Sequence, residues 1–159
     1  MFAKKVGFDV FLGGTTNGSN WRETLINQLS VLAPEIKCFN PVVDNWTKEC
    51  IEIENFVKFH AGYHVYVLTP KMAGVYSIAE MCDSIHNVTK RTFVYVQEED
   101  YDIAGNPIKW DLQMRNSLYA VTQLIAAHEG YVATSIEDLA QAIAKEYHET
   151  PHTKRNVTL

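Results

Sequence analysis

The sequence lacks long hydrophobic runs and is poor in cysteine. No stretch approaches the ~18 continuous apolar residues that a membrane-spanning helix requires, and the first residues do not contain the apolar core of a secretory signal peptide. The 3 cysteines form no C-x-x-C pair and are odd in number, which argues against a disulfide framework and against a zinc site. These absences lead us to expect a cytoplasmic protein without a membrane partner.

Clustered positive charge is missing as well. The chain holds 14 lysines and arginines against 19 aspartates and glutamates, for a formal net charge of −5. Binding to the phosphate backbone of a nucleic-acid polymer needs clustered cations, so we expect no such partner. A small anionic ligand stays possible, because a few local donors suffice to bind it.

The length and composition are those of one globular domain. A chain of 159 residues, 47% of them hydrophobic and 21% charged, is long enough to bury a sizeable core. The sequence shows no internal repeat and no second domain. We assign residues 1–150 to a single domain and residues 151–159 to a polar tail.

Apolar segments alternate with amphipathic segments along the domain. The continuous apolar segments predict strands, and the segments between them place apolar residues at helical spacing. The predicted strands are 6–12, 36–40, 64–69, 92–96 and 131–133. The predicted helices lie at about 21–32, 51–59, 78–85, 110–128 and 136–147, and an acidic, solvated loop is expected at 98–107.

This alternation indicates the fold class. Strands without a polar face need helices on both sides, which is typical of a parallel sheet. A sheet of about five strands with helices on both faces has the size of a flavodoxin-like, doubly wound α/β domain. In such a fold, ligands bind beyond the carboxyl ends of the strands.

One carboxylate is expected at that edge of the sheet. Glu80 follows the predicted strand at 64–69 and a loop at 70–74, near the expected first turn of a helix. Free backbone N–H groups at a helix N-terminus can bind an anion, so this segment is a candidate ligand site. An ordinary first-turn acid that complements the helix dipole gives the same pattern, and the sequence leaves both interpretations open.

A polar loop punctuated by glycine follows the first predicted strand. Gly13 and Gly18 have the spacing of a P-loop, but Ser19 stands in place of the lysine that would reach the terminal phosphates. ATP hydrolysis is therefore disfavoured. What remains is a rim of hydroxyls and backbone N–H groups followed by Arg22, which suits a sugar or a phosphate, although a simply capped helix has the same pattern.

The sequence contains neither a metal-binding motif nor a serine-nucleophile motif. His60 and His64 have an i, i+4 spacing, but Gly62 interrupts the helix between them and no H-E-x-x-H glutamate follows. Ser77 lacks the surrounding G-x-S-x-G pattern of a nucleophile elbow. We expect neither a metal ion nor an organic cofactor.

Four segments occur in an order that is more specific than any one of them: Phe11-Leu12-Gly13-Gly14-Thr15-Thr16, Trp21-Arg22, Asn40-Pro41 with Asp44, and Tyr76-Ser77-Ile78-Ala79-Glu80. From about Asp9 to Ile143, the chain resembles the nucleoside 2-deoxyribosyltransferase superfamily, and in particular its divergent deoxyribosyltransferase-like branch. The resemblance implies a flavodoxin-like fold and chemistry at the N-glycosidic bond between a base and a (deoxy)ribose. It also places the catalytic glutamate of the family at Glu80.

The resemblance implies a mechanism through a covalent intermediate. The carboxylate of Glu80 would attack the anomeric carbon as the base leaves, and water or a second base would then resolve the resulting ester. Better-known members of the family carry an acid just after the central strand, where this chain has Pro70-Lys71-Met72. Asp44 would then be the remaining acid that protonates the leaving base.

The implied protein is an enzyme, either a nucleoside 2-deoxyribosyltransferase or an N-glycosidase of nucleosides or nucleotides. A homo-oligomer is expected, since members of the family often build their active sites across subunit contacts. A catalytically silent nucleotide-binding module on the same scaffold is the alternative, because the acid after the central strand is missing. The expected substrate-binding residues are Gly13, Gly14, Thr15, Thr16, Asn17, Trp21, Arg22, Tyr76 and Ser77.

Overall fold

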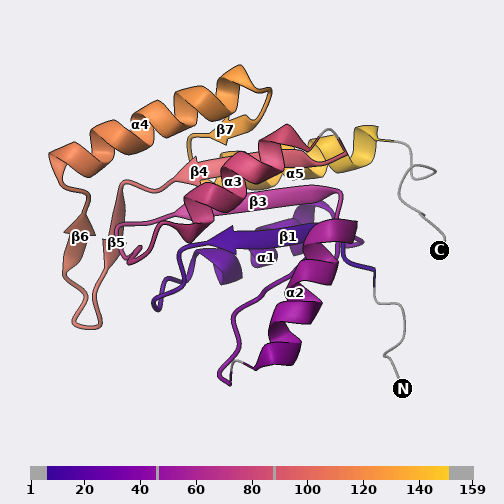
Figure 1. Ribbon diagram of the computed structural model, residues 1–159, viewed down its shortest axis with the longest axis horizontal. Helices are drawn as coiled ribbons and strands as arrows, with labels where there is room; N and C mark the ends of the chain where they lie inside the picture. Colours follow the sequence, from indigo (N-terminus) through magenta and orange to yellow (C-terminus); the bar gives the residue numbers. More distant parts are fainter. Residues whose placement is uncertain (1–6, 46, 88, 151–159) are drawn as a thin grey trace.

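The computed structural model describes residues 7–45, 47–87 and 89–150 (Figure 1). Its main sheet has five parallel strands in the order β2-β1-β3-β4-β7. These strands are β1 (Val10–Gly14), β2 (Cys38–Phe39), β3 (Tyr63–Leu68), β4 (Arg91–Val96) and β7 (Tyr131–Ala133). Counted within the sheet, this is the 2-1-3-4-5 order of flavodoxin-like folds, so the predicted fold class is confirmed. The predicted tail at 151–159 lies outside the described residues.

Helices cover both faces of the sheet. In the described part of the chain they are α1 (Trp21–Leu32), α2 (Lys48–His60), α3 (Tyr76–His86), α4 (Leu112–Ala127) and α5 (Ile136–Glu149). The helices α1 and α5 pack together behind the sheet in Figure 1, whereas α2, α3 and α4 contribute to the core of the other face. None of these described helices has the length and apolarity needed to cross a membrane.

Each face has its own apolar core, because the side chains of a strand point alternately to opposite sides. On β1, Val10 and Leu12 belong to the core beneath α1 and α5, and Phe11 belongs to the opposite core. Every residue of β3 is buried, which explains why that segment has no polar face in the sequence. The carboxyl ends of β1 and β3 meet where Gly14 pairs with Val67.

The first strand extends further toward its carboxyl end than the sequence predicts. The expected end before Gly13 is wrong, since β1 includes both Gly13 and Gly14; residue 6, where the predicted strand begins, lies outside the described residues. Gly14 has a φ of 113°, and a Cβ atom there would collide with the carbonyl oxygen of Val67. Glycine thus lets β1 approach β3 closely at the point where the loop begins.

The expected acidic loop at 98–107 is wrong in part. β5 (Glu99–Tyr101) and β6 (Pro107–Lys109) form an antiparallel hairpin, at the left of Figure 1. Asp100 is buried there, because its carboxylate accepts a hydrogen bond of 2.7 Å from Ser19 Oγ and lies 3.7 Å from Lys71 Nζ. The partners that allow this acid to be buried come from distant segments, so the local sequence does not reveal them.

A buried hydrogen-bond chain joins β3, α3 and β4. His64 Nε2 donates to the carbonyl oxygen of Lys58 at 2.9 Å, so the neutral ring accepts a hydrogen bond at Nδ1 from Ser84 Oγ, also at 2.9 Å. Ser84 Oγ lies 2.8 Å from Thr92 Oγ1. Burial lowers the pKa of His64 to about 4, and the charges of Lys90 and Lys58 act in the same direction. The ring is therefore neutral in the folded protein at neutral pH.

We predict that His64 makes the protein lose stability between pH 6.5 and about pH 4. Above this window the ring of His64 is neutral in both the folded and the unfolded protein. Within the window, the ring binds a proton in the unfolded chain but not in the folded chain. The free energy of unfolding should fall by about 3 kcal/mol across the window. Urea unfolding at both ends of the window measures the loss, and His64→Gln should lack this contribution. A ring that titrates at its ordinary pKa in NMR spectra of the folded protein would contradict the prediction.

Candidate active site

A cavity of about 460 Å³ lies beyond the carboxyl ends of β1 and β3. Its walls come from β1 and the loop after it, the first turn of α1, the loop after β2, the helix α2, and α3 with the loop that precedes it. The sheet continues from β1 to β2 on one side and to β3 on the other. The cavity therefore lies where the winding direction of the chain reverses, which is the usual ligand site of open α/β sheets.

A buried arginine determines the shape of the loop after β1. Arg22, on the first turn of α1, donates hydrogen bonds to the carbonyl oxygens of Leu12 at 3.2 Å, Gly14 at 3.1 Å and Thr15 at 2.7 Å. Trp21 Nε1 donates to the same Thr15 carbonyl at 2.8 Å. Burial lowers the pKa of Arg22 to about 10, and the group remains a cation at neutral pH. Arg22 thus lines the cavity with much of its hydrogen-bonding capacity used by the backbone.

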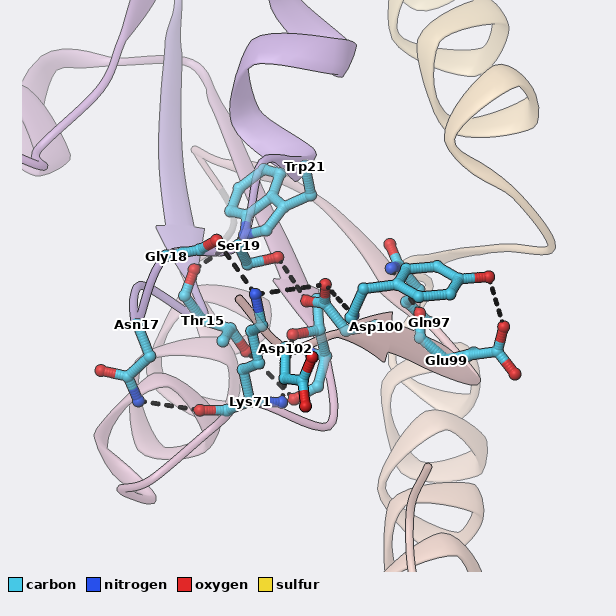
Figure 2. Close-up of polar contacts among 12 residues, drawn as sticks. Thr15, Asn17, Gly18, Ser19, Trp21, Lys71, Gln97, Glu99, Asp100 and Asp102 are labelled. Carbon is cyan, nitrogen blue, oxygen red and sulfur yellow. Dashed lines mark hydrogen bonds and ion pairs between the residues drawn. The ribbon is translucent and has the colours of Figure 1, made fainter. Parts of the chain in front are cut away.

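Side-chain contacts also join the loop after β1 to the loop after β3 (Figure 2). Thr15 Oγ1 accepts a hydrogen bond of 2.9 Å from the backbone N–H of Thr69. Asn17 Nδ2 donates to the carbonyl oxygen of Lys71 at 2.8 Å, and Lys71 Nζ donates to the carbonyl oxygen of Gly18 at 3.1 Å. The loop after β1, which forms the polar side of the cavity, is therefore bound both to α1 and to the loop after β3.

Glu80 enters the cavity from the helix α3. It is the fifth residue of this helix, whose first turn, beginning at Tyr76, carries no acid. Glu80 therefore lies just beyond the first turn, and of the two interpretations that the sequence leaves open, complementation of the helix dipole does not account for the residue. Its side chain is 11% exposed and lies among the residues that line the cavity, together with Ser77 of the same helix.

A lysine from α2 links Glu80 to a second carboxylate. Lys58 Nζ forms an ion pair with Glu80 Oε1, and it lies 3.0 Å from Glu54 Oε1, one helical turn away on α2. The ammonium group lies 5.1 Å from the ring centroid of Phe11 and 5.4 Å from that of Tyr76, within the range of cation–π attraction. Both carboxylates line the cavity, and one ammonium group holds them close to each other.

The charges in this cluster influence one another. Burial raises the pKa of Glu80 above its ordinary value, while the hydrogen bond from Lys58 and its charge act to lower it. Burial also acts to lower the pKa of Lys58, but its hydrogen bonds to Glu80 and Glu54 outweigh that effect and raise it. Lys58 is therefore a stable cation between two carboxylates.

The structure brings together most of the residues that the sequence singles out. The predicted site residues that line the cavity are Gly13, Gly14, Thr15, Thr16, Asn17, Arg22, Tyr76, Ser77 and Glu80. Trp21 is outside this lining and is 1% exposed in the core beneath α1. Asp44 is outside it too: it is exposed to solvent, one residue beyond Val43, which does line the cavity.

Sequence reasoning missed Glu54 and Lys58. Their i, i+4 spacing is a recognisable ion-pair pattern on a helix, but such pairs are usually solvated, and nothing local shows that α2 turns this pair toward α3. Among the described residues, no group of three or more histidine, cysteine, aspartate or glutamate side chains is arranged to hold a metal ion.

Comparison with protein families supports an assignment of the chain. A family model described as "Nucleoside 2-deoxyribosyltransferase like" matches residues 7–100, and this segment includes every residue that lines the cavity. Comparisons with curated proteins and with solved structures gave no match.

Proposed function

The chain belongs to the nucleoside 2-deoxyribosyltransferase-like family, and from this premise we propose that it cleaves the N-glycosidic bond of a (deoxy)nucleoside or nucleotide and transfers the sugar to water or to another base. The observation that carries the proposal is the position of Glu80. Its carboxylate lines the cavity beyond the carboxyl ends of β1 and β3, beside a paired cation. A carboxylate so placed meets the requirements of a nucleophile toward an anomeric carbon.

The proposed reaction has two steps. First, a carboxylate oxygen of Glu80 attacks the anomeric carbon, the bond to the base breaks, and a glycosyl ester forms. Second, water or another base attacks the same carbon, and the carboxylate of Glu80 is released. Each step inverts the anomeric carbon, so the product retains the configuration of the substrate. Water as the acceptor makes the protein a hydrolase, and a base makes it a transferase.

The lining of the cavity supports a ligand that has an apolar part and a polar part. Pro41, Val42 and Val43, from the loop after β2, provide an apolar wall that suits the face of a base. Thr16 and Ser77 provide hydroxyls on the polar side, which suit a sugar. Sites for small molecules commonly combine apolar walls with a few such polar groups.

Asp44 is the proposed donor of the proton that the leaving base requires. Departure of a purine or pyrimidine from the sugar needs a proton or a hydrogen bond on the base. Asp44 follows the apolar wall directly in the sequence, and its exposed position next to Val43, which lines the cavity, is what supports this role.

We predict that Glu80→Gln and Glu80→Ala each reduce turnover about a thousandfold or more, since neither side chain can form the ester. Nucleoside binding should persist, because Arg22 and the loop after β1 are unchanged. Turnover is measured by monitoring the release of free base by chromatography, and binding is measured by calorimetry. A 2-deoxy-2-fluoro nucleoside should add the mass of its sugar to a peptide that contains Glu80. Full activity of Glu80→Gln, or an adduct on another residue, would instead favour a role in binding alone.

For Asp44→Asn, we expect slower cleavage of nucleosides with poor leaving groups and little change for those with activated ones. An activated base departs without a proton, so the loss of a proton donor does not affect it. Single-turnover rates for the two kinds of substrate provide the comparison, and Asp44→Glu serves as the control that retains the acid. Equal slowing of both substrates would show that Asp44 is not the donor.

We also expect the chain to form a homo-oligomer through the outer face of α2. This helix buries only Val57 among its residues, whereas Ile53, Phe56 and Phe59 are 52%, 55% and 76% exposed. Apolar side chains gathered in this way are typical of subunit contacts. Sedimentation analysis should detect the oligomer, and replacing Phe56 and Phe59 by serine should weaken it. A strict monomer at micromolar concentration would refute this expectation.

A further inference from the structure

A buried carboxylate lies beside the start of α1, at the far end of the loop after β1. Asp100, from the hairpin strand β5, accepts a hydrogen bond of 2.7 Å from Ser19 Oγ. Ser19 precedes Trp21, the first residue of α1, by two positions. The start of a helix attracts anions, and glycine-punctuated loops bind the phosphates of nucleotides there. In this protein a carboxylate of the chain itself lies beside that helix start.

The same carboxylate engages a lysine from the loop after β3 (Figure 2). Lys71 Nζ lies 3.7 Å from Asp100 Oδ1 and donates a hydrogen bond of 3.1 Å to the carbonyl oxygen of Gly18. The next two residues of the chain, Met72 and Ala73, line the cavity, whereas Lys71 does not. Its ammonium group is therefore directed to the hairpin and to the loop after β1, and not to a ligand in the cavity.

Asp100 remains an anion at neutral pH. Burial acts to raise its pKa, but hydrogen bonds from Ser19 and Thr69 and the charge of Lys71 outweigh burial and lower the pKa. The backbone N–H of Tyr101 also donates to Asp100 Oδ1, at 2.8 Å. A phosphate that approached Lys71 would thus meet a fixed negative charge, and the juxtaposition of like charges works against binding.

The lining of the cavity does not compensate for this repulsion. Of the described residues that line it, the cation is Arg22, which donates to the carbonyl oxygens of three residues. Glu54 and Glu80 add two carboxylates to the same lining. The backbone N–H of Ser19, at the far end of the loop, donates to the carbonyl oxygen of Thr16 at 2.8 Å. The groups that could hold a phosphate are therefore largely bound within the protein.

Building on the proposed function, we propose that Asp100 is a specificity-determining residue, which binds Lys71 and Ser19 in place of a ligand phosphate. The cavity then accepts a nucleoside and rejects the corresponding 5′-monophosphate. The carboxylate has the partners that a phosphate would need, namely a hydroxyl group, an ammonium group and the start of a helix. A nucleoside carries an uncharged 5′-hydroxyl group, which needs only neutral hydrogen-bonding partners such as Thr16 and Asn17 in the lining.

The first test compares nucleosides, both ribo and 2′-deoxy, with their 5′-monophosphates as substrates of the unchanged protein. For the preferred base, we expect kcat/KM, measured from the release of free base, to be roughly a hundredfold or more higher for the nucleoside. A 5′-monophosphate cleaved as efficiently as its nucleoside would overturn this inference and leave the proposed function standing. Cleavage of neither kind of substrate would overturn the proposed function itself.

Removal of the carboxylate should weaken this preference. In Asp100→Ser, which leaves room for a phosphate beside Lys71 and Ser19, we expect the ratio of kcat/KM for nucleoside over monophosphate to fall about tenfold or more. Asp100→Asn removes the charge, keeps the size of the side chain, and should lower the ratio as well. Glu98→Gln removes a negative charge from an exposed position of the same segment and should keep the original ratio. An unchanged ratio in both Asp100 variants, folded as judged by circular dichroism, would show that Asp100 does not set the preference.

Binding of inorganic phosphate provides a second measurement, which needs no turnover. Calorimetry should detect phosphate binding to Asp100→Ser at roughly millimolar concentration, because this variant frees Lys71, Ser19 and the start of α1 for an anion. The unchanged protein should not bind phosphate under the same conditions. Adding Lys71→Met to Asp100→Ser should abolish the binding, since it removes the cation. Absence of binding to Asp100→Ser, or equal binding by the unchanged protein, would overturn the role of Asp100.

Discussion

The close parallel pairing of β1 with β3 is the constraint on which the rest of the site depends. Gly14 pairs with Val67 and leaves no room for a side chain at that position. The carbonyl groups at and just after this end of β1 are bound by side chains from the first turn of α1. Arg22 donates to the carbonyl oxygens of Gly14 and Thr15, and Trp21 donates to that of Thr15 as well. Strand pairing thus fixes the loop, and the loop forms one wall of the cavity.

The opposite wall depends on a balance of charges. Moving a carboxylate out of water costs several kcal/mol unless a partner compensates, and Glu80 is largely buried. Lys58 compensates from α2, and Glu54 and Glu80 in turn keep the ammonium group charged. Removing Lys58 would therefore leave two neighbouring carboxylates to repel each other. The nucleophile proposed here is held by a charge cluster that spans two helices, and its placement relies on how these helices pack on the sheet.

The family assignment and the structure support one another through the same segment of chain. The matched residues, 7–100, include the whole lining of the cavity but neither α4 nor α5. Those two helices complete the cover of the sheet, α5 against α1 and α4 on the other face. The part of the chain that the family model describes is thus the part that builds the site, and the remainder supports it.

The sequence alone determined the fold class and much of the site. Continuous apolar strands alternating with amphipathic helices specify a doubly covered parallel sheet, because such strands have no polar face to expose to water. The glycine-punctuated loop and Glu80 were predictable as well, since ligand sites of this fold class lie beyond the carboxyl ends of strands. These features are encoded locally, in the period of apolar residues and in single residues at strand ends.

Only the tertiary structure decided which side chains meet. It buries Trp21 in the core, leaves Asp44 outside the cavity lining, and forms a hairpin where the sequence predicts a solvated acidic loop. It also brings Glu54 to Glu80 through Lys58. An ion pair across two helices depends on the direction in which each helix packs, and no periodicity within either helix carries that information. The place of Glu80 at the edge of the sheet was therefore predictable from sequence, whereas its charged neighbours became visible only in the folded chain.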